Sequence, residues 1–154
     1  MLLLFAAIAM EAIAQPSLPG FVVGYNVERD GNSITEQVPS GETVQKWTRM
    51  VTTQRFAGVA RRTDADGFLQ LMLNGLQQAC PGATVAYRRP ATRSAQMRVD
   101  CPLNPATGLP ETFFAKAMPG AADMHVAQVA FRRDPSGKDV DWAEGYLAKV
   151  DLKP

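Results

Sequence analysis

After the N-terminal residues, the chain contains two short segments with the residue pattern of β-strands. Residues 21–28 are rich in β-branched and aromatic residues, and the next segment places Ile34, Glu36 and Val38 on one face. Asp30-Gly31 between them favours a tight turn, because both residue types tolerate a positive φ angle. The pattern therefore predicts a β-hairpin.

Apolar residues at helical spacing follow in two places. The first stripe consists of Val44, Trp47, Met50 and Val51. Ser40 can cap a helix that starts before this stripe, and we expect this helix to end at Gln54. The second stripe begins at the capping pair Thr63 and Asp66, and it ends before Pro81, which cannot continue a helix. The pattern predicts two consecutive amphipathic helices.

Four alternating segments and a final amphipathic stretch complete the chain. The segments lie at residues 83–87, 95–99, 111–118 and 124–132. Short connections between strands favour an antiparallel sheet. A last helix begins near Asp139 or Asp141 and places Trp142 on its inner side. We therefore expect an α+β fold, a mainly antiparallel sheet covered by amphipathic helices, in the approximate order ββααββββα.

The chain opens with an apolar run that reaches Met10, which is half of the ~20 residues needed to cross a bilayer. Ala12-Ile13-Ala14 follows with the small-x-small pattern of a signal-peptidase site. No basic residue precedes Arg29, so a buried N-terminal helix or strand stays open as the alternative. The pattern favours a cleavable leader, with cleavage near Ala14/Gln15.

A leader implies a periplasmic or secreted protein. The expected division of the chain is a signal peptide at 1–14, a short tether at 15–20 and a single α+β domain at 21–154. No transmembrane segment is predicted in the mature chain, because no later apolar run is long enough to cross a bilayer.

Composition and charge narrow the range of functions. Hydrophobic residues make up 46% of the chain and charged residues 20%, as in ordinary globular domains with a packed core. The formal net charge of +1 is too close to zero to predict nucleic acid as a bulk partner.

The two cysteines, Cys80 and Cys101, stand just outside the two ends of the predicted hairpin at 83–99. In an exported protein such a pair predicts a disulfide that joins neighbouring strands. Two cysteines and the single histidine of the chain cannot fill a tetrahedral zinc shell without a carboxylate. We predict a disulfide here, and neither a metal site nor a cofactor.

The stretch at 36–43, followed by Trp47-Thr48 and by the later Cys80-Pro81 and Cys101-Pro102, resembles a set of small exported bacterial proteins. The element order resembles the sandwich of the photosystem PsbP group. The first resemblance implies an envelope location and would cover most of the mature chain. It implies no activity, so no catalytic residue is carried over.

The sequence contains few motifs that are typical of catalytic sites, and we predict no catalytic residue. His125 is the only histidine, and a small hydrolase would have to be centred on it. No G-x-S-x-G motif or phosphate-binding loop supports an enzyme. Alternation places His125 on the face of Val129 and Phe131, which favours a structural role. The carboxylate pairs of the chain lie at predicted helix starts, where capping explains them.

Arginines near predicted turns and element ends are the best indication of a binding site. They are Arg61, Arg62, Arg88, Arg89 and Arg93. If they converge, their guanidinium groups could bind an anionic surface or a phosphate or carboxylate group. If they do not, they are solvated turn residues. Trp47 is a further candidate for a ligand groove, although its place on an apolar stripe favours core packing.

The sequence therefore favours a non-enzymatic exported protein that binds a protein partner of the envelope or an anionic surface. Two alternatives remain open at this stage. One is a small hydrolase centred on His125, and the other is a carrier that encloses a small apolar ligand. The oligomeric state does not follow from the sequence.

Overall fold

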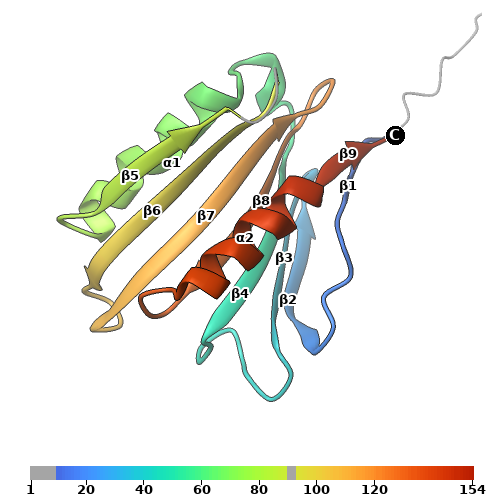
Figure 1. The fold of residues 1–154 in the computed structure, drawn as a ribbon. Helices are drawn as coiled ribbons and strands as arrows, with labels where there is room; N and C mark the ends of the chain where they lie inside the picture. Colours follow the sequence, from blue (N-terminus) through green and yellow to red (C-terminus); the bar gives the residue numbers. More distant parts are fainter. Residues whose placement is uncertain (1–9, 90–92) are drawn as a thin grey trace, which may run out of the picture.

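The computed structural model describes residues 10–89 and 93–154, and an antiparallel sheet of seven strands forms its centre (Figure 1). The strand order across the sheet is β2-β3-β4-β8-β7-β6-β5. The strands are β2 (Phe21–Arg29), β3 (Asn32–Pro39), β4 (Arg49–Phe56), β5 (Thr84–Arg88), β6 (Ala95–Asn104), β7 (Leu109–Pro119) and β8 (Met124–Phe131). The predicted α+β class with a mainly antiparallel sheet is confirmed.

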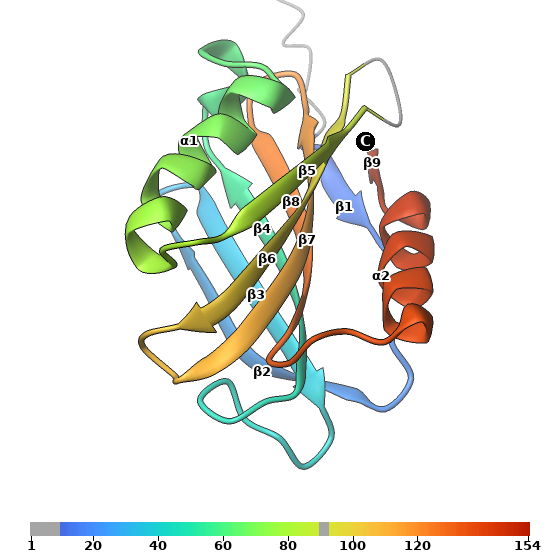
Figure 2. The same ribbon diagram turned by 60° about the vertical axis from the view of Figure 1, so that its left-hand side comes forward.

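Two helices cover the sheet from opposite sides (Figure 2). The elements outside the large sheet are β1 (Ala12–Ala14), the 3-10 helix η1 (Val59–Arg61), α1 (Ala65–Ala79), α2 (Gly137–Lys149) and β9 (Asp151–Lys153). Strands β1 and β9 pair with each other as a separate antiparallel ribbon. The result is a layer of helix on each face of one sheet.

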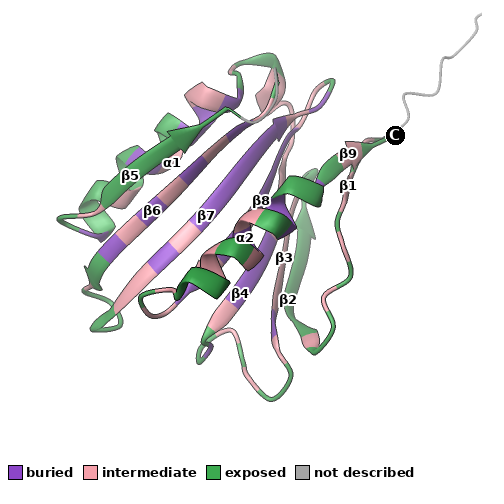
Figure 3. Cartoon of the chain, in the orientation of Figure 1, coloured by how far each residue is buried: buried purple, intermediate pink, exposed green. Residues whose placement is uncertain are grey.

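The central strands β7 and β8 are buried on both faces, as the purple segments of Figure 3 show. Ala115 and Ala117 pack in the core cluster under α1, whereas Phe114 and Met118 pack in the cluster under α2. Successive side chains of a strand point to opposite faces, so a strand between two helices needs apolar residues at nearly every position. Edge strands β2 and β5 are mostly exposed.

Both helices begin at side chains that satisfy free backbone N–H groups. The Asp64 carboxylate accepts a hydrogen bond from the Gly67 N–H at 2.8 Å and caps α1. Ser136 and Asp139 form a capping box at the start of α2. The predicted starts of these two helices are therefore correct to within a few residues.

The helix predicted to end at Gln54 is wrong, because Arg49–Phe56 forms strand β4. Residues 51–53 are Val-Thr-Thr, and β-branched residues favour a strand over a helix. Val51 pairs with Val129 of β8, and this pairing between distant strands stabilises the extended conformation that the β-branched residues favour. Trp47 consequently lies in the loop before β4 and not on a helix.

Residues on both sides of the predicted cleavage point take part in the fold. Strand β1 pairs with β9, the Glu11 carboxylate accepts a hydrogen bond from the Ala121 N–H at 2.7 Å, and the Tyr146 hydroxyl donates one to Gln15. A strand near the N-terminus was the alternative to a leader, and Ala12–Ala14 forms one. The division at residues 14 and 15 stays a prediction, and residues 1–9 lie outside the described part.

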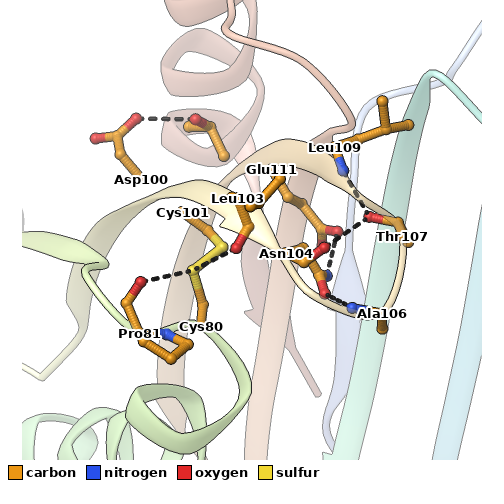
Figure 4. The surroundings of a disulfide bond; sticks show 11 residues. Cys80, Pro81, Asp100, Cys101, Leu103, Asn104, Ala106, Thr107, Leu109 and Glu111 are labelled. Carbon is orange, nitrogen blue, oxygen red and sulfur yellow. Dashed lines mark hydrogen bonds between the residues drawn. A yellow bond between two sulfur atoms is a disulfide. The ribbon is translucent and has the colours of Figure 1, made fainter.

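Cys80 and Cys101 form a disulfide with a Cα–Cα distance of 5.9 Å (Figure 4). Cys80 follows the last residue of α1, and Cys101 lies in β6. The predicted hairpin behind this pair is present, since β5 and β6 pair from Thr84 opposite Asp100 onward. Its predicted turn at residues 90–92 lies outside the described residues.

Lys116 of β7 connects the sheet to the end of α2. Its ammonium group is buried and donates hydrogen bonds to the carbonyl oxygens of Leu147 at 3.1 Å and Val150 at 2.7 Å. These carbonyl groups carry the negative end of the helix dipole. Burial lowers the pKa of Lys116, and the Asp151 carboxylate opposes this shift.

None of the helices in the described part of the chain has the length and apolar character required to span a bilayer.

Reduction of the disulfide should lower the free energy of unfolding by roughly 3 kcal/mol, because an open chain gains entropy in the unfolded state. Denaturant titration of the oxidised protein and of Cys80→Ala/Cys101→Ala measures this difference. Equal midpoints for the two proteins would show that the disulfide does not stabilise the fold.

Lys116→Met should lower the free energy of unfolding by about 1–3 kcal/mol, because the α2 carbonyl groups lose a charged donor. Lys149→Met, at an exposed position of α2, is the control and should change stability little. Thermal unfolding of both variants tests this, and an unchanged or raised midpoint for Lys116→Met would contradict the assigned role.

Candidate functional site

Four of the five candidate arginines line one pocket of ≈ 440 Å³ beside the start of α1. Arg61 and Arg62 come from the end of η1, Arg89 follows β5, and Arg93 precedes β6. The antiparallel pairing of β5 and β6 brings the last two arginines to the same end of the sheet. We call this feature the arginine pocket.

Two carboxylates also line the arginine pocket, and both have partners. Asp64 caps α1, and Asp66 forms an ion pair with Arg89 at 2.5 Å. Within residues 10–89 and 93–154, the guanidinium groups of Arg61, Arg62 and Arg93 form no ion pair with a carboxylate. The pocket therefore keeps positive charge available for an anion.

Ser94 adds a donor to the arginine pocket. Its side-chain oxygen is buried and has no hydrogen-bond partner among the described residues. A buried hydroxyl without a partner costs free energy in the free protein, and an anion oxygen placed in the pocket would recover it. The first backbone N–H groups of α1 add positive potential at the same place.

Arg88 is the one candidate arginine that does not line the arginine pocket. Its guanidinium group pairs with the Glu144 carboxylate of α2 at 2.6 Å. It lines a neighbouring pocket of ≈ 660 Å³, which Arg93 and Ser94 also line and which includes the carboxylates of Glu11 and Asp151. The charge of Arg88 is therefore balanced within the protein.

Trp47 lies far from the arginines along the strands, in the loop that leads into β4. It packs with Val38 and Met50, and the guanidinium group of Arg132 lies 4.2 Å from the centre of its ring. The contacts with Val38 and Met50 are those of a core residue, and Trp47 also lines a groove on the sheet.

His125 is buried in β8 and faces the α2 side of the sheet, opposite Met118 of β7. Burial is the largest effect on the pKa of His125 and lowers it. The carboxylates of Asp123 and Glu11 raise this pKa by less, and the Arg55 guanidinium group lowers it further. No side-chain hydrogen bond contributes to this shift among the described residues. A nucleophile activated by His125 needs such a bond, so the arrangement gives the hydrolase alternative no support.

The described side chains give little support to metal binding or to a carrier of apolar ligands. No three histidine, cysteine, aspartate or glutamate residues of the described part lie close enough to hold a metal ion. The ≈ 660 Å³ pocket is open, and charged side chains line it together with apolar ones, so it differs from the closed apolar cavity that a carrier of apolar ligands requires.

Comparison with known proteins identifies the fold and gives no family. No protein-family model matches the chain, and no curated protein sequence matches it. The Saccharomyces cerevisiae Ran-binding protein Mog1p has a similar structure, with a TM-score of 0.59, 10% sequence identity and coverage of 92% of this chain and 94% of that one. A Mog1 E65A mutant gives a TM-score of 0.59 at 11% identity, covering 91% and 90%.

Two predictions are corrected by these comparisons. Two solved structures that share the fold are Mog1 proteins, and neither of them belongs to the PsbP group or to a set of exported bacterial proteins, which corrects both predicted resemblances. The predicted periplasmic or secreted location is corrected as well, because the neighbours that share the fold are Mog1 proteins, one of them described as a Ran-binding protein, and they give export no support. The sequence likeness rested on short motifs of low specificity, and it did not constrain the fold.

Acid should destabilise the protein partly through His125. Burial lowers the pKa of His125 below 6.5 in the folded state, so over a range that begins near pH 6.5 and extends below it the unfolded chain binds a proton that the folded chain does not. The free energy of unfolding should therefore decrease as the pH falls through this range. Denaturant titrations of the wild type and of His125→Gln measure the slope, and equal slopes would contradict the effect of burial.

Proposed function

We propose that this protein is a non-enzymatic binding protein whose arginine pocket receives an acidic segment of a protein partner. The observation that carries this proposal is the convergence of four arginines from separate parts of the chain beside the start of α1. Arg61, Arg62 and Arg93 supply the charge, and Ser94 supplies a further donor.

The chemistry of these groups favours carboxylates as ligands. A guanidinium group offers a planar pair of N–H donors that matches the two oxygens of a carboxylate. Arg89 already forms an ion pair with the Asp66 carboxylate, with 2.5 Å between the nearest nitrogen and oxygen, so the pocket holds one internal example of an arginine–carboxylate contact. A partner segment with several acidic side chains would engage the arginines that lack a carboxylate.

The structural neighbours support a protein as the source of the acidic segment. Mog1p, which shares the fold along 92% of this chain, is described as a Ran-binding protein. This shows that a sheet with one helix on each face can serve as a protein-binding scaffold. The partner of the present chain is defined here only by its acidic chemistry.

The proposal is tested with Arg61→Glu/Arg62→Glu, which reverses two charges without removing a described ion pair. Binding of a blocked hexaglutamate peptide to the wild type, measured by calorimetry, should weaken with added salt. The variant should lose at least ~10-fold in affinity, because hydrogen bonds between charged groups are lost.

The matched control is Lys46→Glu/Lys138→Glu, which makes the same change in net charge at exposed positions away from the pocket. The control should bind the peptide with nearly wild-type affinity. Equal affinities for the two double variants would show that net charge alone attracts the peptide, and would refute the arginine pocket as its site.

A further inference from the structure

A second recognition surface lies on the same face of the sheet as α1, in the half that α1 leaves free. Helix α1 lies over β6 and β7 (Figure 2). In the described part of the chain, no helix covers the remaining half over β2, β3 and β4. A groove of ≈ 380 Å³ runs across β3, β4, β8 and β7 there, and we call it the sheet groove.

The floor of the sheet groove is polar. Glu36 of β3 pairs in register with Thr52 of β4, and Thr52 pairs with Gln128 of β8. These three residues form one row on one face, because directly paired residues of neighbouring strands point to the same side. Gln128 donates a hydrogen bond to the side-chain oxygen of Gln54 at 3.0 Å, which fixes the two amides beside Glu36.

Glu36 is an unpaired charge in this groove. Within the described residues, its carboxylate forms no ion pair and no hydrogen bond. It is half-buried between Ile34 and Val38 of its own strand, and burial raises its pKa above the usual value. A partly desolvated carboxylate without a partner costs stability, and this cost is recovered when a cation binds.

Aromatic side chains line the apolar part of the groove. Trp47, in the loop before β4, and Phe113 of β7 both line the groove. Arg132 also lines the groove, but its guanidinium group is already held by the Trp47 ring at 4.2 Å and by the Gln45 carbonyl oxygen at 2.8 Å. Glu111 adds a second carboxylate, so the charged lining contains two anions and one cation.

We propose that the sheet groove binds a lysine or arginine side chain of a protein partner, with Glu36 as the counter-ion. The side-chain oxygen of Gln128 lies in the same row and can accept a second hydrogen bond from the cation. The aliphatic stem of the lysine or arginine packs against the apolar lining.

The surroundings of the groove favour a protein segment over a small free cation. Edge strand β2 continues the same face, since Tyr25 pairs with Glu36 and Val27 with Ile34. Tyr25 and Val27 are 44% and 40% exposed, and Val22 is 43% exposed. These exposed apolar side chains extend the contact area beyond the groove, and a small cation would leave them in water.

The sheet groove and the arginine pocket are independent sites. Strand β7 contributes Glu111 and Phe113, near its start, to the groove, and Pro119, its last residue, to the arginine pocket. The two sites therefore lie toward opposite ends of the sheet. The two sites also carry opposite charges, so a variant that abolishes binding at one site still allows binding at the other to be measured.

The test is an NMR titration of the full chain with a blocked Leu-Arg-Leu tripeptide. Saturable shifts should occur at the side-chain amides of Gln54 and Gln128 and at the indole N–H of Trp47. Glu36→Gln should weaken this binding by at least ~10-fold, because a charged hydrogen bond is lost. Binding with unchanged affinity, or the absence of shifts at these groups, would refute the proposal.

The matched control is Glu28→Gln, which removes a carboxylate of the same hairpin. Glu28 pairs in register with Ser33 and binds Arg55 on the opposite face, at 2.8 Å, so this variant should bind the tripeptide like the wild type. The Arg61→Glu/Arg62→Glu variant should also keep tripeptide binding, which separates failure of the groove from failure of the arginine pocket.

Two further ligands identify the source of the cation. A tripeptide with norleucine in place of arginine should bind at least ~10-fold more weakly, because it lacks the charge. N-acetylarginine amide should also bind more weakly than the tripeptide, because it cannot cover the apolar residues of β2. If it binds equally well, the groove recognises a small cation, and the assignment to a protein partner is wrong.

Discussion

The burial of β7 and β8 on both faces is the constraint on which the rest of the structure depends. Side chains that alternate along these strands supply one core cluster to α1 and another to α2, for example Ala115 and Phe114. Each helix is placed by the cluster that it covers, and burial of apolar area is the main favourable term in that placement. Lys116 and the Cys80–Cys101 disulfide then fix the end of each helix to the sheet.

Local patterns predicted the elements whose periodicity is supported by turn or capping residues. The hairpin around Asp30-Gly31 and helix α1, which Asp64 caps, are examples. The segment at 49–56 was assigned incorrectly, because Met50 and Val51 fit a helical stripe and also serve opposite faces of a central strand. Only pairing with β8 decides between these two, and long-range pairing is not visible in a short window of sequence.

Prediction of the two proposed binding sites depends on the strand topology even more than prediction of the helices and strands does. The arginines near turns were visible in the sequence, but their convergence requires that the end of β5 and the start of β6 lie beside η1. Arg88 and Arg89 are neighbours in sequence, yet Arg88 pairs with Glu144 of α2 and Arg89 with Asp66 of α1. Glu36 was correctly placed on one face with Ile34 and Val38, yet nothing local shows that α1 leaves this face uncovered. We therefore propose one cationic and one anionic recognition surface, toward opposite ends of the sheet.

A crystal structure of the protein with the hexaglutamate peptide tests the central claim most directly, since it locates the acidic ligand. The account predicts peptide carboxylates within about 3 Å of the guanidinium groups of Arg61, Arg62 or Arg93, with one oxygen near the Ser94 hydroxyl. A peptide seated elsewhere, with these groups free of contacts to it, would contradict the account.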